Sequence, residues 1–404
     1  MNDLITYAFK NLKKRMLRSS LTVLSILVGI MAIFILVSFG QGLSNYMSET
    51  FDELGADKLI ALPRGGFLGA GSAFFFTDDE ITVVERTPGV RSAAGMSYDF
   101  TEAQRSQTDA PVGLIAMGLP TTGREGDLAR DMFPVDIVEG RYLRNNERDN
   151  VVVGYSFSQP NRVFERAISV GERIFVRGRE MRVIGIFGEM GNPEDDRAVY
   201  MDINIYAELF NKENRFEYIY IQAQPNTDVD RLRDEIARRL RRHLDQEEGH
   251  EEFFVQTFQS LLESYGNIIL VINSIVTMIA LISVVVAGIN TTNTMYTSVL
   301  ERTQEIGVMK AIGAKNSDIL KIFLFESGTL GLIGGFAGIV LGYLAASAGG
   351  IILAQIGYSI LQPFFPWWLW VGSLIFAITV GTLSGILPAM QASKQNPVDA
   401  LRYE

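Results

Sequence analysis

Two histidines are the residues of this chain best suited to bind a metal ion. His243 and His250 lie in the stretch RRHLDQEEGHEE, which also carries the carboxylates of Glu247, Glu248, Glu251 and Glu252. Imidazole nitrogens and carboxylate oxygens are common zinc ligands, but this spacing fits none of the usual zinc patterns. We therefore interpret the stretch as a charged, hydrated loop and expect no metal site.

Signatures of covalent catalysis and of ATP binding are absent from the sequence. The chain has no cysteine, which excludes disulfides and thiol chemistry. It has no GxSxG turn, and its glycine-rich run from Phe67 to Phe76 lacks the Lys and Ser/Thr that end a phosphate-binding loop. We therefore expect no catalytic residue and no cofactor, and no hydrolysis of ATP by this chain itself.

The glycine-rich run is predicted to be a flexible apolar loop. Its aromatic side chains are candidate contacts for a substrate or partner: Phe67, Phe74, Phe75 and Phe76. An inert surface loop is the alternative interpretation.

A charged, amphipathic stretch separates two long apolar runs. Residues 300–323 read LERTQEIGVMKAIGAKNSDILKIF. If this stretch is helical, its spacing places four residues on one face of the helix: Ile306, Met309, Ile312 and Gly313. The charged residues lie on the other faces: Glu301, Arg302, Glu305 and Lys310. Gly313 is predicted to end this helix in a left-handed conformation, and Asn316 or Ser317 to cap the next helix. A rigid element of this kind at a membrane surface suits the transfer of force from a soluble partner; an ordinary helical loop is the alternative.

Four windows nearly free of charge predict membrane spans. They cover residues 19–43, 267–289, 323–348 and 367–387. Each meets the roughly 20 residues, at about 1.5 Å rise, that cross a hydrocarbon core of about 30 Å. A signal peptide is the alternative for the first window, but its apolar run exceeds the roughly 7–15 residues typical of one. Four retained spans place both termini on the same side.

Basic residues set the predicted orientation. Lys and Arg crowd residues 10–18 and recur between 302 and 321. Because loops rich in Lys and Arg stay inside, both termini are expected to be cytoplasmic in a multi-pass protein of the plasma or inner membrane. Residues 1–18 are then a basic amphipathic helix on membrane lipid, 290–322 a cytoplasmic loop and 388–404 a cytoplasmic tail.

The segment 44–266 is then extracytoplasmic, as is the short loop 349–366. The long segment carries a net charge of about −14, since the whole chain carries −10 and the other residues about +4. An acidic exterior argues against a nucleic-acid partner. Its patterns predict an α+β domain of two lobes, with helices over 77–84 and 229–244 and a hairpin over 171–187.

Glycine at close spacing marks the third window. Gly331, Gly335 and Gly338, with Gly334 and Gly342, provide small-xxx-small contacts. We expect tight helix packing within the protomer or across a dimer interface. Pro388 is predicted to close the fourth span.

Three blocks of the sequence resemble the membrane subunits of the MacB/FtsX-like family of ATP-binding-cassette (ABC) transporters. They are ERTQEIGVMKAIGAKNSDILKIFLFES (301–327), AFKNLKKRMLRSSLTVLSILVGI (8–30) and PAMQASKQNPVDALRYE (388–404). The resemblance implies a four-span α-helical bundle with a large MacB-like α+β domain inserted between the first two spans. It also implies that the family's glutamate within the third span, here Glu326, is paired near the cytoplasmic interface; a proton relay is its alternative role.

The resemblance further implies a function and partners. A separate ATPase subunit would bind ATP and Mg and press on the helix from about 303 to 312, moving the outer domain for export or extraction of an amphipathic drug, peptide or lipoprotein. The expected coupling residues are Glu301, Arg302, Glu305, Ile306, Gly307, Met309, Lys310, Ile312 and Gly313. A second permease copy, as a homodimer or heterodimer, and an extracytoplasmic adaptor are further expected partners. Alternatives are an FtsX-like signalling module that regulates a cell-wall hydrolase, and a membrane-anchored enzyme.

Overall fold

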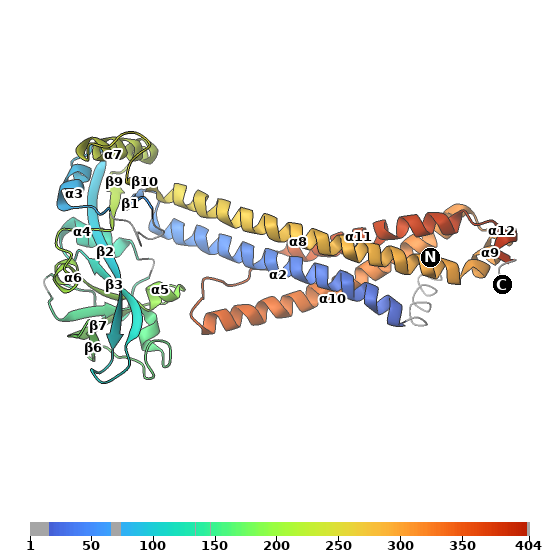
Figure 1. Cartoon of the computed structure of the whole chain (residues 1–404), viewed down its shortest axis with the longest axis horizontal. Coiled ribbons are helices and arrows are strands. Elements are labelled where there is room, and N and C mark those ends of the chain that lie inside the picture. Colours follow the sequence, from blue (N-terminus) through green and yellow to red (C-terminus); the bar gives the residue numbers. More distant parts are fainter. Residues whose placement is uncertain (1–15, 66–73, 134, 146, 402–404) are drawn as a thin grey trace. The chain divides into compact units, whose positions relative to one another are not determined.

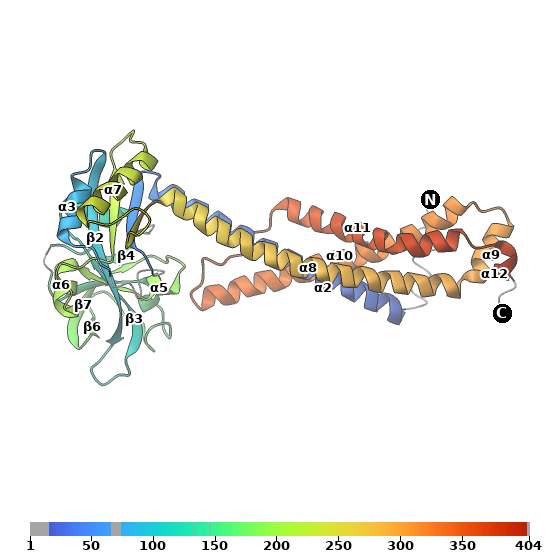
Figure 2. The same cartoon turned by 45° about the horizontal axis from the view of Figure 1, so that its top comes forward.

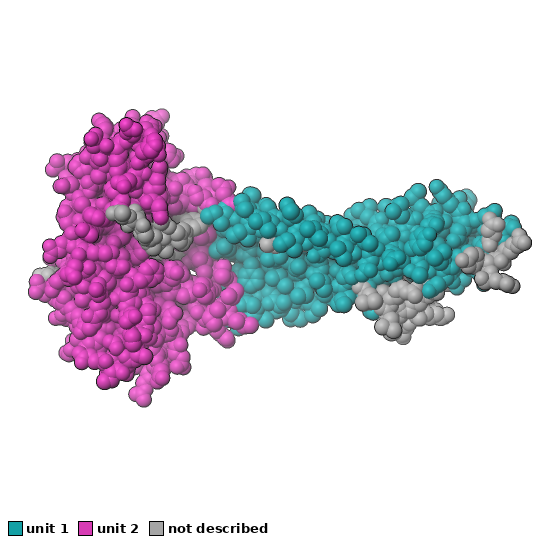
Figure 3. Space-filling view, in the orientation of Figure 1, with its two compact units in different colours: residues 1–43, 268–351, 362–404 teal, residues 44–267, 352–361 magenta. Residues whose placement is uncertain are grey.

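A computed structural model describes residues 16–65, 74–133, 135–145 and 147–401. The chain divides into two compact units, coloured separately in Figure 3. Unit 1 comprises residues 1–43, 268–351 and 362–404, and unit 2 comprises residues 44–267 and 352–361. The predicted N-terminal helix over 1–18 lies outside the described residues up to residue 15.

Four long helices are apolar enough to cross a membrane: α2 (Met16–Leu54), α8 (Phe258–Glu301), α10 (Asn316–Gln355) and α11 (Trp367–Ser393). Each contains one of the predicted windows, which confirms four apolar helices with a large α+β domain between the first two. Along α8, side chains such as Ile275, Ile279 and Ile282 are exposed, as suits contact with lipid. In Figure 1 these four helices carry the blue, yellow and orange-to-red parts of the chain.

Pro388 does not close the fourth helix, which corrects the prediction. Helix α11 continues through Pro388 to Ser393. Proline lacks the N–H that would bond to the carbonyl four residues earlier, which belongs to Ser384. Thr292 Oγ1 of α8 donates to that carbonyl instead, at 2.8 Å. A side chain from a neighbouring helix thus satisfies the group that proline leaves unpaired, and the helix continues.

Small residues let α10 pack closely against its neighbours, as predicted for this glycine-rich helix. A Cβ atom added to Gly331 would lie 2.5 Å from the Ala377 carbonyl oxygen of α11. A Cβ atom on Gly338 would lie 2.8 Å from the Leu27 carbonyl oxygen of α2. The backbones can approach so closely because glycine has no side chain, and these contacts form within the protomer.

Two short helices accompany the long helices of unit 1. Helix α9 (Thr303–Ala311) follows α8, and helix α12 (Pro397–Leu401) follows α11. They lie side by side in both Figure 1 and Figure 2, near the ends of the red and orange helices.

Unit 2 is an α+β domain whose described strands form one mixed sheet. The strands are β1 (Lys58–Pro63), β2 (Val90–Gln104), β3 (Val112–Leu119), β4 (Ile137–Gly140), β5 (Asn150–Val153), β6 (Arg173–Val176), β7 (Arg179–Phe187), β8 (Val199–Asp202), β9 (Tyr218–Ala223) and β10 (Phe253–Thr257). Their order is β10-β1-β9-β2-β3-β8-β5-β7-β4, and β6 pairs with both β2 and β7. The pairs β3–β8 and β5–β7 are parallel.

Helices and a 3-10 turn cover this sheet: α3 (Asp78–Glu85), α4 (Gly123–Asp131), η3 (Tyr155–Ser158), α5 (Pro193–Asp196), α6 (Ile203–Phe210) and α7 (Val229–His243). Helix α3 begins with a capping box between Thr77 and Glu80, and α7 buries Leu232, Ile236 and Leu240. Both helices were predicted, α3 from an N-cap Thr or Asp with an acidic first turn, and α7 from its apolar period.

The predicted hairpin is β6–β7. Arg177 and Gly178 join the strands with φ of 49° and 79°. Positive φ at both central residues matches the twist of the flanking strands, which is why glycine at one of them is informative.

Candidate functional site

Helix α9 packs one face into the core of unit 1. Thr303, Ile306 and Gly307 are buried on this face, and Ile306 is fully buried. The surrounding core takes residues from three long helices: Met295 and Val299 of α8, Ile319, Phe323 and Leu330 of α10, and Ala389 and Ala392 of α11. The apolar contacts therefore connect α9 to three apolar helices at once.

A buried ion pair holds the beginning of α9. Arg302 separates α8 from α9, and its Nη1 donates to Glu326 Oε2 of α10 at 2.9 Å. Both side chains are only 9 % exposed. The sequence predicted that Glu326 would be paired, and the structure identifies the partner, which lies 24 residues earlier in the chain. Loss of one partner from a buried ion pair costs about 3–5 kcal/mol.

A lysine holds the end of α9. Lys310 Nζ donates to the carbonyl oxygens of Ser393 at 2.8 Å and Gln395 at 2.7 Å. The last carbonyls of a helix lack partners within the helix and favour a cation, so Lys310 binds where α11 ends. Gly313 has φ of +107°, as predicted for the residue that turns the chain after α9.

The opposite face of α9 is exposed. We define the α9 outer face as Gln304, Glu305, Val308, Ala311 and Ile312, all of which are exposed. Val308 is 50 % exposed and Ile312 is 81 % exposed. Exposed apolar side chains bordered by polar ones are typical of protein–protein contacts.

The predicted grouping of Ile306 with Ile312 was therefore wrong. Ile306 points into the core, whereas Ile312 lies beyond the last helical residue, Ala311, and its backbone already belongs to the turn at Gly313. Of the other predicted coupling residues, Arg302, Gly307 and Lys310 lie inward, Met309 is partly buried, and Glu301, Glu305 and Gly313 are exposed. Their role in coupling stays a prediction.

Two phenylalanines of the glycine-rich run, Phe74 and Phe76, pack in the domain core. Phe67 lies outside the described residues. Phe76 is fully buried and packs edge-on against Phe74, with ring centroids 5.1 Å apart. Phe75 lies beneath the guanidinium group of Arg215, 4.4 Å from the ring centroid. Phe76 is thus a core residue rather than a contact residue of a flexible loop, because its ring joins the core with Phe253 of β10.

His243 has a neighbour that the sequence did not reveal. Its Nε2 lies 3.1 Å from Glu80 Oε1, which connects α7 with α3. Within the described ranges, no three His, Asp or Glu side chains are grouped as metal ligands.

Family comparisons agree with the order of the apolar helices and the inserted domain along the chain. Residues 19–239 match the model of the MacB-like periplasmic core domain, and residues 277–397 match the FtsX-like permease C-terminal model. A protein of Methanocaldococcus jannaschii, named as an ABC transporter permease, is 34 % identical over 404 residues, covering 100 % of this chain and 98 % of that protein. The permease YknZ of Bacillus subtilis is 27 % identical, covering 99 % of this chain and 98 % of its own.

A longer relative and a solved structure extend the comparison. The macrolide export ATP-binding/permease protein MacB of Rhodopirellula baltica is 26 % identical over 99 % of this chain, but the match spans only 62 % of that protein. The crystal structure of the periplasmic region of MacB from Actinobacillus actinomycetemcomitans covers 55 % of this chain and 98 % of its own, with 13 % identity and a TM-score of 0.43. The membrane subunits of this family are generally non-catalytic. The chain belongs to the MacB/FtsX-like family of ABC transporter permeases and is a multi-pass membrane protein.

Proposed function

We propose that this chain couples ATP hydrolysis by a separate ATPase subunit to movement of its outer domain, and that the ATPase docks on the α9 outer face. One observation carries this proposal: α9 is fastened along its inner face and presents exposed apolar side chains on its outer face. A soluble partner that pushes on Val308 and Ile312 pushes on an element tied to α8, α10 and α11.

The polar contacts at the two ends of α9 explain how a force on α9 would reach the long helices. Arg302 ties the beginning of α9 to α10, and Lys310 ties its end to α11. Because packed elements with fixed polar contacts move as bodies, displacement of α9 displaces these helices. Helices α2 and α8 continue without a break into residues of unit 2, so their motion reaches the inserted domain. We call this mechanotransmission.

Topology and partners follow from the same proposal. Docking of a cytoplasmic ATPase on α9 requires both termini to be cytoplasmic and unit 2 to be extracytoplasmic. ABC ATPases act as pairs, so two permease copies, identical or different, assemble with them. The ATPase supplies ATP and Mg binding, while this chain is not an enzyme. Relatives named as macrolide exporters support export of an amphipathic substrate such as a drug.

The test is copurification of the ATPase with variants of the outer face. Val308→Asp/Ile312→Asp places charges where apolar surface would be buried. Loss of that burial amounts to about 2 kcal/mol, or about a 30-fold weaker Kd. The tagged chain and the variant are purified from native membranes, and the ATPase in each eluate is quantified. The matched control is Val138→Asp, an exposed valine of β4 in unit 2.

The expected result is an ATPase that copurifies with the wild type and the control but not with the double variant. Equal retention by all three proteins would remove docking from the α9 outer face. An eluate with a cell-wall hydrolase or a sensor kinase, and no ATPase from any of the three, would replace export with FtsX-like signalling.

A further inference from the structure

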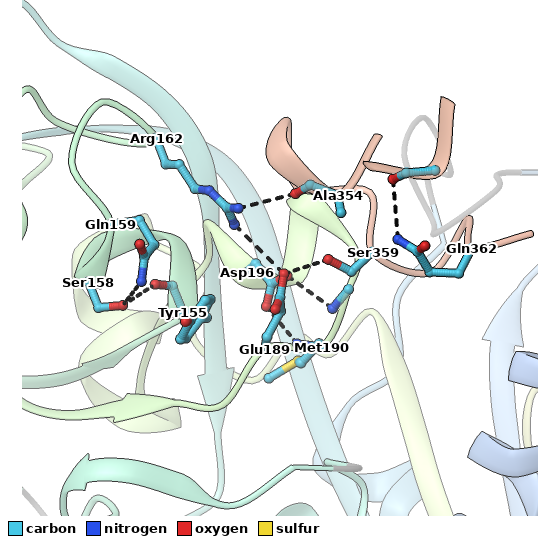
Figure 4. A network of polar contacts seen from close by, with 12 residues as sticks. Tyr155, Ser158, Gln159, Arg162, Glu189, Met190, Asp196, Ala354, Ser359 and Gln362 are labelled. Atoms are coloured by element: carbon cyan, nitrogen blue, oxygen red, sulfur yellow. Dashed lines mark hydrogen bonds and ion pairs between the residues drawn. The ribbon is translucent and has the colours of Figure 1, made fainter. Parts of the chain in front are cut away.

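The connection between α10 and α11 is bound to the α+β domain within unit 2. Residues 352–361 belong to this unit, and Figure 4 shows their polar contacts. Ser359 Oγ donates to Glu189 Oε1 at 2.6 Å, and the Ile360 amide donates to the Gly191 carbonyl at 3.0 Å. Three segments distant in sequence meet here, because Arg162 also takes part.

Arg162 contacts both sides of this junction. Its Nη2 donates to the Ala354 carbonyl in the last turn of α10 at 3.1 Å, and its Nη1 lies 3.8 Å from Glu189 Oε1. Glu189 therefore accepts from Ser359 while it pairs with Arg162, as Figure 4 shows. Removal of the Glu189 charge would weaken both contacts.

The loop that receives these contacts is itself fixed. Fully buried Asp196 accepts hydrogen bonds from the amides of Met190, at 2.8 Å, and Gly191, at 3.0 Å. Gly191 has φ of +80°, and a Cβ atom there would lie 3.0 Å from the Ile360 nitrogen. Glycine at this position both permits the turn and lets the connecting loop approach the backbone.

The outer end of α2 reaches the same loop. Tyr46 Oη donates to the Met190 carbonyl at 2.8 Å. Residues 189–196 thus receive polar contacts from α2 and from the segment that joins α10 to α11. This fixed loop therefore contacts both the end of α2 and the segment that follows α10.

The contacts that hold residues 352–361 on the domain can break and form again. Two apolar side chains of this segment, Ile356 and Tyr358, are exposed and therefore contribute little buried apolar surface to its docking. Arg162 and Glu189 are partly exposed, and an ion pair of this kind contributes little to stability. Segments held by few apolar contacts and by accessible hydrogen bonds open more readily than a core does.

We propose that residues 352–361 and 189–196 form a releasable latch through which α10 and α11 act directly on the outer domain, with Glu189 as its positioning residue. The role of this latch in transport rests on the proposed function, whereas the existence of the latch does not. With the latch closed, movement of α10 pulls on residues 189–196 in addition to any movement of α2 and α8. With the latch open, only α2 and α8 drive the domain.

Spin labels test the latch, because the chain has no native cysteine. Ile356→Cys and Val138→Cys place labels on exposed positions of the connecting segment and of β4. The distance distribution between the labels is measured in the full-length chain in detergent without nucleotide. A closed latch gives one narrow distance. Glu189→Gln and Ser359→Ala, each added to the labelled chain, should lose that narrow distance.

Glu194→Gln is the matched control, because it removes the same charge from an exposed position of the same loop. Gel filtration of every variant shows that the fold persists. A narrow distance retained in both Glu189→Gln and Ser359→Ala would overturn the latch, as would a broad distribution in the wild type.

A second measurement adds the purified ATPase and ATP with vanadate. Movement through the latch predicts a nucleotide-driven change in label distance in the wild type that is absent from Glu189→Gln. The same change in both proteins would overturn the role of Glu189. If the ATPase fails to bind at all, the proposed function fails, whereas the measurement without nucleotide still decides whether the latch exists.

Discussion

The buried pair of Arg302 and Glu326 gives the sharpest prediction for the coupling element. We expect Glu326→Leu alone, and Arg302→Met alone, to destabilise the protein far more than the two changes together. Each single change removes one member of a pair whose charged atoms lie 2.9 Å apart, in a site where both side chains are 9 % exposed. The double change replaces the pair with two apolar side chains.

The magnitude follows from burial. Removal of one member of a buried pair costs about 3–5 kcal/mol, whereas replacement of a whole buried pair with apolar residues is often close to neutral. At about 2–4 °C per kcal/mol for a domain of about 150–250 residues, each single variant should melt about 10 °C below the wild type. The double variant should melt above both.

The assay is a double-mutant cycle on thermal unfolding of the purified chain in detergent, followed by intrinsic fluorescence. The coupling free energy between the two sites should be several kcal/mol and favourable. Single variants that melt close to the wild type, or effects that simply add in the double variant, would refute the view that this pair fixes α9 to α10.

Three further predictions concern other contacts. Lys310→Met keeps the aliphatic stem but loses the bonds to Ser393 and Gln395, so it should retain ATPase binding in copurification while lowering the ATPase rate of the complex; an unchanged rate would contradict its role. Gly331→Ala should lower the melting temperature because its Cβ meets the Ala377 carbonyl, at a cost of about 1–3 kcal/mol, whereas Gly372→Ala in α11, with nothing within 4 Å, should not; similar effects would show that the close packing is unimportant. Burial, reinforced by the nearby carboxylates of Glu189 and Asp195, raises the pKa of Asp196 from 3.8 to about 6. The raised pKa means that the folded state binds this proton more tightly, so the contribution of Asp196 to stability is complete below its unfolded pKa and is lost as pH rises through about 6. The loss is on the order of 3 kcal/mol. Relative to Asp196→Asn, the wild type should lose melting temperature mainly between about pH 4 and about pH 6, and parallel curves would contradict the shift.

Much of this architecture was predictable because its signals are local. Hydropathy over some twenty successive residues identified the four apolar helices, since a membrane span needs no partner to be recognised. The period of Leu232, Ile236 and Leu240 identified α7, and Gly313 identified the turn after α9, since both depend on residues within one or two turns.

Strand β2 could not be predicted from local sequence signals. Its sequence VRSAAGMSYDFTEAQ is poor in branched apolar residues and predicted no strand, yet it is the longest of the described sheet. Pairing with β9, β3 and β6 decides its conformation, and these partners lie up to 133 residues away, counted from Val90 to Ala223. Tertiary contacts override propensity in such central strands.

The sequence by itself determined that a short helix with Arg302, Lys310 and a terminal Gly313 lies between two apolar helices, and that Glu326 requires a partner. Only the tertiary structure decided that Arg302 is this partner, that Lys310 caps α11, and that Ile312 faces outward. The same holds for the junction of Glu189 with Ser359, 170 residues apart. Side-chain type and helical period follow from neighbouring residues, but the identity of a partner depends on how distant segments pack, which no local pattern encodes.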